Sequence, residues 1–306
     1  MRFLITGGRG FAAPHLRDRL IADGHSAYAT HTDVTIKGGL FKLIKQSKID
    51  GIFNLAAKTH PPTSFDEPEK YFSVNCTGVI NIIQAITKYH PHAVLMQCST
   101  SEVYGIHPEG THISENTPCI PPNPYAVGKY AADLYIQERC TNGMLKAFIT
   151  RAFSHTGPGR PPNYSISSDA IQIAKILKRN AEPVIKVGNL KCKRVVMDVR
   201  DVVGVYANLM YKYLGQGSTS GVSMNGQVYN IGGDNLHSIG FYLYKMLSMY
   251  GLRDIEVKVD PLLFRKFDIP VQYPDSNKVR KLLGWKPNCN MNKTLKDLVE
   301  YWKERV

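Results

Sequence analysis

Short apolar stretches alternate with helical patterns along the first half of the chain. Five of these stretches are typical of buried strands: Arg2–Thr6, Ser26–Thr30, Gly51–Ala56, Ala93–Cys98 and Lys146–Thr150. Between these strands lie segments whose apolar residues recur at helical spacing, at Phe11–Asp23, Leu40–Ser47, Val74–Tyr89 and Tyr125–Thr141. Strands that alternate with helices in this way predict a parallel sheet with helices on both faces.

The pattern changes after Arg151, where a loop rich in proline and glycine, GPGRPP, begins at Gly157. The remaining sequence predicts helices at Ser168–Arg179, Asp201–Tyr213, Ile239–Tyr250 and Leu295–Arg305, and a strand at Val184–Val187. We therefore expect a second, smaller lobe, parts of which return to the main sheet. The fold class predicted is α/β, a doubly wound Rossmann-type parallel sheet followed by a C-terminal lobe.

The composition limits the kinds of partner that we expect this protein to bind. The 306 residues are 43% hydrophobic and 21% charged, which is typical of a compact globular protein. The net charge of +13 favours an anionic partner, but no run of five basic residues and no nucleic-acid-binding motif occurs, so we expect no nucleic acid. No apolar run approaches the roughly 18 residues of a membrane span, and MRFLITGG is typical of a strand and turn. We expect a cytoplasmic protein that does not contact a membrane.

The six cysteines are widely spaced and lack CxxC pairs or a neighbouring histidine. This spacing indicates a reducing compartment and predicts neither disulfides nor a metal site. Cys192 lies between Lys191 and Lys193, so we expect its side chain to be exposed.

A glycine turn follows the first predicted strand, in the stretch TGGRGFAA from Thr6. Gly7 permits a tight turn, Gly10 lets backbone N–H groups approach a pyrophosphate, and the helix from Phe11 offers its positive end. The pattern predicts a dinucleotide site. We expect residues 1–157 to form the dinucleotide-binding domain, with returns at about 195–235, and residues 158–306 to form mainly the substrate-binding lobe.

The charges around this turn favour NADP over NAD. NAD-selective sites usually have a carboxylate at the end of the second strand, whereas this chain has Thr30 and His31 there. Arg9, inside the turn, is suited to a 2′-phosphate. We expect Asp33, two residues further on, to contact the adenine instead.

Tyr125 and Lys129 are four residues apart, which places them on one face of the predicted helix. A free phenol has a pKa of about 10, and a neighbouring ammonium group should lower it, so that Tyr125 can exchange a proton near neutral pH. Thr100, after the strand that ends at Cys98, is expected to hydrogen-bond the reacting oxygen at the same edge of the sheet.

These motifs make the chain resemble extended short-chain dehydrogenases/reductases that act on nucleotide-diphosphate sugars, most closely the group of GDP-mannose 4,6-dehydratases and GDP-6-deoxy-4-keto-mannose reductases. The resemblance spans nearly the whole sequence. It is carried by TGGRGF, NLAA, SFDEPE, VNCTG, STSEVYG and PYAVGK in the first half, and by RAFSHTGP, PVIKVGNL, DVRD and LGWKP in the second. It implies that Lys129 also reaches the nicotinamide ribose and that Ala56, in NLAA, contacts the cofactor.

Glu102 favours a 4,6-dehydratase. Such an enzyme must remove the C5 proton and expel the C6 hydroxyl, and a carboxylate two residues after Thr100 is suited to that step. In this scheme Tyr125 takes the O4 proton during C4 oxidation, Glu102 deprotonates C5, water leaves and hydride returns to C6, so the cofactor could remain tightly bound. A 4-keto reductase or epimerase is the alternative, because related 4-keto reductases resemble this chain in the segment that contains Thr100 and Glu102. A non-catalytic dinucleotide sensor is a third hypothesis.

The resemblance also implies the substrate contacts. Arg194 and Arg265 would bind the diphosphate, for which a planar guanidinium group is well suited. Asn163, Lys186 and Asn189 are candidates for the base and ribose. The helices at Val74–Tyr89 and Tyr125–Thr141 resemble those of a four-helix dimer interface, so we expect a homodimer.

Overall fold

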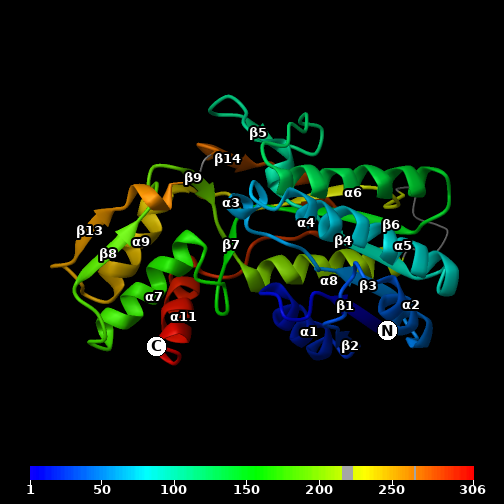
Figure 1. The fold of residues 1–306 in the computed structure, drawn as a ribbon, viewed down its shortest axis with the longest axis horizontal. Coiled ribbons are helices and arrows are strands. Elements are labelled where there is room, and N and C mark those ends of the chain that lie inside the picture. The colour runs from blue at the N-terminus through cyan, green and yellow to red at the C-terminus, as the bar shows by residue number, and fades with distance from the viewer. Residues whose placement is uncertain (216–222, 265–266) are drawn as a thin grey trace.

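The structure is a computed structural model that describes residues 1–215, 223–264 and 267–306 (Figure 1). Within these residues, a six-stranded sheet has the order β11-β6-β4-β3-β1-β2, and each neighbouring pair is parallel. The strands are β1 (Arg2–Thr6), β2 (Ser26–Ala29), β3 (Gly51–Asn54), β4 (Val94–Cys98), β6 (Ala147–Ala152) and β11 (Val228–Ile231). The prediction of a Rossmann-type parallel sheet is confirmed.

Helices cover both faces of this sheet. One face carries α1 (Ala12–Ala22) and α8 (Val199–Gly215), and the other carries α2 (Lys37–Gln46), α5 (Gly78–Tyr89) and α6 (Pro124–Thr141). The alternation of side chains along β1 shows why: Phe3 and Ile5 join the core beneath α1 and α8, whereas Leu4 joins the opposite core. Both sheet faces are therefore buried.

Two elements from the second half of the chain return to the large sheet. Helix α8 packs against α1, and β11 pairs with β6 at the edge of the sheet. Helix α8 begins at Val199, two residues before the predicted start. The stretch Val228–Ile231 was not predicted as a strand, although it lies in the part of the chain, about 195–235, that was expected to return to the large sheet.

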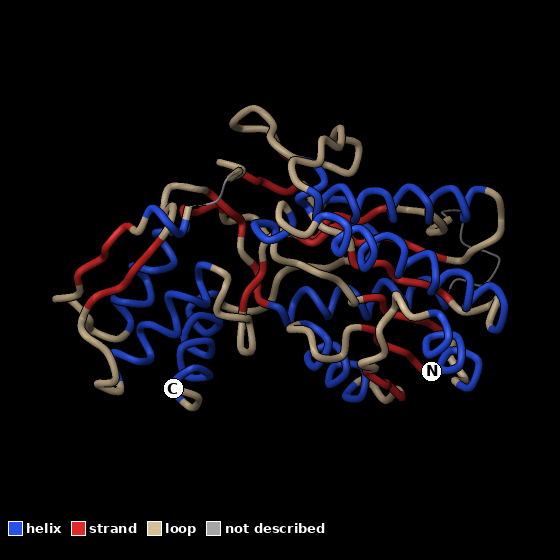
Figure 2. The backbone as a smooth tube through the Cα atoms, viewed as in Figure 1, coloured by secondary structure: helices blue, strands red, loops and turns tan. Residues whose placement is uncertain are grey.

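The smaller lobe packs around its own hydrophobic core. Three helices surround it: α7 (Ser165–Leu177), α9 (Ile239–Met249) and α11 (Met291–Lys303). Strands β8 (Val184–Val187) and β13 (Glu256–Val259) form a parallel pair on this lobe. Figure 2 shows these helices and strands set apart from the large sheet.

Short elements connect the two parts. A sheet of order β12-β9-β14-β5 is built from β12 (Leu236–Ser238), β9 (Lys193–Val195), β14 (Val271–Pro274) and β5 (His112–Ile113). The remaining elements are α3 (Pro61–Ser64), α4 (Pro68–Phe72), the π-helix at Ser73–Thr77, β7 (His155–Thr156), β10 (Met197–Asp198), α10 (Asn277–Leu283) and the 3₁₀ turns at Ser101–Tyr104 and Pro261–Leu263. In the described part of the chain, none of the helices combines the length and hydrophobicity needed to cross a bilayer.

The topology determines where a ligand can bind. The chain moves from β1 to β2 on one side and then to β3 on the other, so the loops after β1 and β3 diverge. In open α/β sheets this divergence opens a crevice at the carboxyl ends of the strands. The glycine turn after β1 and the Thr100 segment after β4 both lie at this edge.

Candidate active site

A cleft of about 1050 Å³ lies between the large sheet and the smaller lobe. It brings together most of the residues that the sequence singled out. Those that line it are Gly7, Arg9, Gly10, Phe11, Thr100, Glu102, Tyr125, Lys129, Asn163, Lys186, Asn189 and Arg194. Asp33 and Ala56 are not among the lining residues, and Arg265 lies outside the described residues.

The glycine turn has the geometry that a pyrophosphate requires. Gly7 has φ +70°, and a Cβ atom at this position would lie 2.7 Å from the backbone nitrogen of Ala56. The backbone of Ala56 therefore lies so close to Gly7 that no side chain fits at this position. The Gly10 N–H donates to the Gly7 carbonyl at 2.8 Å, and no side chain caps the start of α1. The first N–H groups of this helix remain available to an anion, so these residues fit a dinucleotide.

The end of β2 carries no carboxylate in the structure. Thr30 is buried there, and its carbonyl accepts a hydrogen bond from the Gly8 N–H at 2.8 Å. Asp33 is exposed, and its Oδ1 accepts from the backbone N–H and the hydroxyl of Thr35, at 2.8 and 2.7 Å. This carboxylate closes a local turn, and its contact with adenine stays a prediction.

Helix α6 brings the tyrosine and the lysine into the cleft. Pro124 begins the helix, and the four-residue spacing places both side chains on the buried face, with Tyr125 7% and Lys129 2% exposed. Lys129 Nζ donates to the Cys98 carbonyl at 2.8 Å, at the end of β4. The ammonium group thus connects the catalytic helix to the sheet edge.

Tyr125 and Lys129 are both removed from water in this structure. Burial raises the pKa of Tyr125 well above its usual value, and a hydrogen bond with Thr100 only partly opposes this. Burial also lowers the pKa of Lys129, and this ammonium group donates to a carbonyl. Burial is the largest influence on both groups here, and the lowering of the phenol pKa by Lys129 stays a prediction.

Glu102 is held by a residue that we did not predict. Asn123 Nδ2 donates to Glu102 Oε2 at 3.2 Å, while Asn123 Oδ1 accepts from the Ala126 N–H at 2.9 Å and caps α6. Thr100 Oγ1 accepts from the Glu102 N–H at 3.2 Å. Asparagine before a proline at a helix start is a recognisable capping signal, so Asn123 could have been identified as a cap from sequence. Its bond to Glu102 could not.

Arg194 forms the charged part of the lobe side of the cleft. Its guanidinium group is 3.6 Å from Asp268 Oδ1 and donates to the Lys193 carbonyl at 2.8 Å. Asn189 Nδ2 also donates to Asp268, at 3.3 Å. Asn163 and Lys186 are exposed at the cleft. No sequence signal identified Asp268, which lies far from Arg194 along the chain.

The expectation that Cys192 is exposed was wrong. Its side chain is 6% exposed, and its thiol donates to Asp268 Oδ2 at 3.0 Å. Because successive side chains of an extended segment point to opposite sides, Lys191 and Lys193 are exposed while Cys192 points inward. Charged neighbours were therefore a poor guide to its burial.

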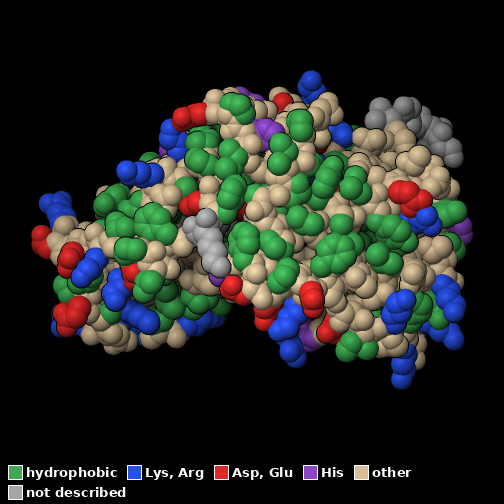
Figure 3. Space-filling view, turned by 45° about the horizontal axis from the view of Figure 1, so that its top comes forward, with side chains coloured by type: hydrophobic (Ala, Val, Ile, Leu, Met, Phe, Trp, Pro, Cys, Tyr) green, Lys and Arg blue, Asp and Glu red, His purple; other side chains and the backbone are tan. Residues whose placement is uncertain are grey.

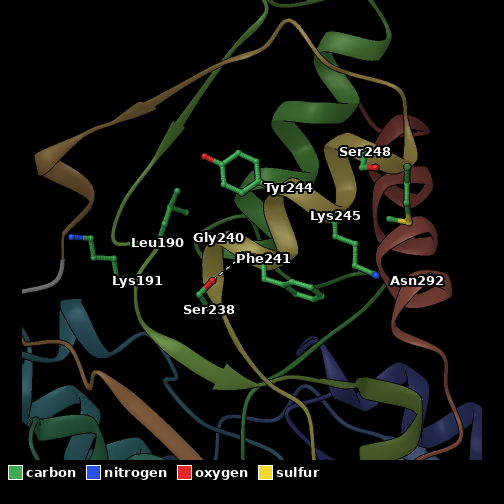
Figure 4. A pocket seen from close by; sticks show the side chains of 10 residues that line it. Leu190, Lys191, Ser238, Gly240, Phe241, Tyr244, Lys245, Ser248 and Asn292 are labelled. Carbon is green, nitrogen blue, oxygen red and sulfur yellow. Dashed lines mark hydrogen bonds between the residues drawn. The ribbon is translucent and has the colours of Figure 1, made fainter. Parts of the chain in front are cut away.

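A second pocket, of about 910 Å³, lies on the smaller lobe (Figure 4). It is lined by the start of α9, where Ser238 Oγ accepts from the Phe241 N–H at 3.2 Å, and by Lys191, Tyr244 and Lys245. None of the predicted catalytic side chains lines it, so the chemistry belongs to the first cleft. Across the described ranges, no group of three or more His, Cys, Asp or Glu side chains could hold a metal ion.

Known proteins resemble this chain along its whole length. GDP-6-deoxy-D-mannose reductase of Pseudomonas aeruginosa is 28% identical over 312 residues, which cover 100% of this chain and 98% of that protein. GDP-mannose 4,6-dehydratase of Vibrio cholerae is 26% identical, over 92% of this chain and 82% of that protein.

Solved structures share the fold. The structure of RMD from Pseudomonas aeruginosa complexed with NADPH has a TM-score of 0.87 and 25% identity, with both chains fully covered. UDP-glucose 4-epimerase of Thermus thermophilus, in complex with NAD, also has a TM-score of 0.87, at 23% identity and with both chains fully covered. A family model described as GDP-mannose 4,6 dehydratase matches residues 27–298. Since this match covers most of the sequence and includes α6, the chain belongs to that family of nucleotide-sugar enzymes.

Proposed function

We propose that this protein is an NAD(P)H-dependent reductase that converts the 4-keto group of a GDP-linked 6-deoxyhexose into a hydroxyl. The observation that carries the proposal is the buried phenol of Tyr125, which lines the cleft together with Thr100 and Lys129, in a chain that matches a GDP-6-deoxy-D-mannose reductase over its full length. Such a phenol is protonated at neutral pH. It is suited to giving a proton to an oxygen that becomes an alkoxide, as ketone reduction requires.

Each catalytic side chain has a role in this reaction. A bound nicotinamide cofactor supplies the hydride. Tyr125 donates its hydroxyl proton to O4, and Thr100, hydrogen-bonded to that phenol, holds the substrate oxygen in place. Lys129 stabilises the phenolate that remains and is fixed for this by its bond to the Cys98 carbonyl.

We favour NADPH as the cofactor, with NADH as the alternative. Arg9 is exposed in the glycine turn, where it can meet a 2′-phosphate, and Thr30 offers no carboxylate to a ribose hydroxyl. The structural relative from Pseudomonas aeruginosa is complexed with NADPH, whereas the epimerase carries NAD.

A 4,6-dehydratase is the second candidate, and Glu102 favours it. Its carboxylate lines the cleft and is oriented by Asn123 at 3.2 Å, so it is available as a base for the C5 proton. The sequence favoured this reaction. We rank it second because the reductase of Pseudomonas aeruginosa is 28% identical over all of this chain, whereas the dehydratase of Vibrio cholerae is 26% identical over 92% of it.

Two incubations separate the candidates. With NADPH and a GDP-4-keto-6-deoxyhexose, a reductase oxidises NADPH. The fall in the absorbance of the reduced nicotinamide measures this oxidation. With GDP-mannose and no added cofactor, a dehydratase produces a loss of water, measured by mass spectrometry. Water loss from GDP-mannose without NADPH consumption would replace the reductase proposal by the dehydratase proposal. The Glu102→Gln variant should then no longer release water from GDP-mannose. Turnover of neither substrate would favour a dinucleotide sensor.

A further inference from the structure

Asp169 is an unusual residue of the cleft. It lies in the second turn of α7, is 3% exposed and lines the cleft from the side of the smaller lobe. Its neighbours at helical spacing, Ile166 and Ile173, belong to the hydrophobic core of that lobe. A carboxyl group therefore occupies a position where the helix otherwise presents apolar side chains.

This carboxyl group lacks the partners that other buried carboxylates have. Asp133 also has one buried oxygen, Oδ1, without a partner among the described residues, but its Oδ2 pairs with Arg151 at 3.1 Å, and Asp198 pairs with Arg200 at 2.6 Å. Asp201 accepts from two backbone N–H groups. In contrast, Asp169 Oδ2 is buried without a hydrogen-bond partner among the described residues, and burial alone raises its pKa to about 7. A buried polar group without a partner is costly unless a ligand supplies the partner.

The surrounding wall is suited to a planar base. Ile166, Val187 and Val196 line the cleft and belong to the apolar core of the lobe. Gln172, one turn beyond Ser168, fixes α7 against β8, because it donates to the Lys186 carbonyl at 3.0 Å and accepts from the Lys186 N–H at 2.9 Å. Asp169 is thus held in a rigid, mostly apolar wall.

The direction of the cleft indicates which part of the substrate reaches this wall. Tyr125 lies on α6, on the large-domain side, whereas α7 lies in the smaller lobe (Figure 1). If the hexose lies at Tyr125 and the diphosphate at Arg194, the nucleobase extends into the lobe. This placement rests on the proposed function.

We propose that Asp169 selects guanine, by accepting hydrogen bonds from N1–H and the N2 amino group with its two carboxylate oxygens. Guanine presents these two donors side by side, and a carboxylate is the side chain that accepts two such bonds in parallel. Adenine has an acceptor at N1. Uracil and thymine place a carbonyl oxygen on each side of N3–H, and both oxygens would face the carboxylate. Asp169 is then a specificity residue of the substrate site.

Calorimetric titration with nucleoside diphosphates tests this assignment. We expect the wild type to bind GDP at least about tenfold more tightly than inosine diphosphate, which lacks only the N2 amino group. Asp169→Asn should bind GDP at least about tenfold more weakly and should gain affinity for xanthosine diphosphate, because an amide can donate to its C2 carbonyl. Such a gain cannot result from misfolding. Ser168→Ala, which alters the adjacent cleft residue, should keep the wild-type preference.

Two other outcomes would contradict different parts of these proposals. If Asp169→Asn binds NADPH normally and still prefers GDP as the wild type does, the role of Asp169 is wrong while the reductase proposal stands. If the wild type itself prefers UDP or dTDP to GDP, guanine recognition is wrong and so is the GDP-linked substrate. NADPH consumption with a 4-keto sugar linked to UDP or dTDP would then show that reductase chemistry survives.

Discussion

At the scale of single residues, burial determines the chemistry of the cleft more than charge does. Tyr125, Lys129 and Asp169 are each buried, and in each case burial shifts the pKa toward the neutral form. The sequence shows which ionisable groups are present. It does not show how much water surrounds them, so the direction of these pKa shifts depends on the tertiary structure.

Tyr125→Phe should lower kcat for keto-sugar reduction by about 10²- to 10⁴-fold, because the proton donor is removed while the ring remains. NADPH affinity should not change. In the wild type, the rate should not fall as pH rises from 7 to 9, since the phenol with its raised pKa stays protonated. A rate that falls through neutral pH would contradict this assignment. Tyr244→Phe, on the second pocket, is the matched control.

Asp169→Asn should change how stability depends on pH. The pKa of Asp169 is raised from 3.8 to about 7 in the folded state, so this carboxyl destabilises the fold progressively as pH rises through that range. The variant has no carboxyl group at this position, so its stability does not fall with pH for this reason. Its gain in unfolding free energy over the wild type should therefore grow from pH 4 to pH 7, by up to about 4 kcal/mol. Urea unfolding at several pH values measures it, and a difference independent of pH would contradict the shift.

At the scale of elements, the start of α6 combines structural and catalytic roles. Asn123→Ala removes the cap and the bond to Glu102. We expect about 1 kcal/mol of lost stability, with reduced kcat because Tyr125 lies two residues further on. Asn290→Ala removes the comparable cap of α11 and should cost similar stability with normal activity. Equal activity in both variants would show that Asn123 is only a cap.

The outer face of α6 is the surface on which we expect the homodimer to form. Val127 and Leu134, seven residues apart on one face, are 46% and 50% exposed, and Phe72 of α4 is 44% exposed. In Figure 3, hydrophobic side chains gather on the central part of the visible face, and most charged side chains lie toward its edges. Leu134→Arg should shift a dimer toward monomer in light scattering. Ile21→Arg, on α1 across the sheet, should not. A wild-type monomer would contradict the expectation.

At the scale of the whole molecule, the two parts of the chain meet across the cleft. The Tyr164 hydroxyl, just before α7, donates to the Thr59 carbonyl at 3.0 Å and lies 2.8 Å from its hydroxyl. Arg160 stacks on the Tyr164 ring at 3.6 Å. This contact joins the smaller lobe to the loop after β3.

Tyr164→Phe keeps the ring for Arg160 but removes both hydrogen bonds to Thr59. We expect KM for the nucleotide sugar to rise about two- to tenfold, with kcat nearly unchanged, because the reacting groups stay in place. Steady-state kinetics at saturating NADPH measures this. A fall in kcat without a change in KM would place Tyr164 in the chemical step instead.

The parallel sheet, the glycine turn and the shared face of Tyr125 and Lys129 could all be predicted from the sequence. These features depend on the periodicity and spacing of residues that are close together along the chain. Three features of the cleft depend on the folded structure: Asn123 holds Glu102, Arg194 pairs with Asp268, and Asp169 is buried without a partner for its Oδ2 among the residues described. Each of these depends on how distant segments pack, and packing sets both the hydrogen-bond partners and the loss of water that govern the ionisation of these groups.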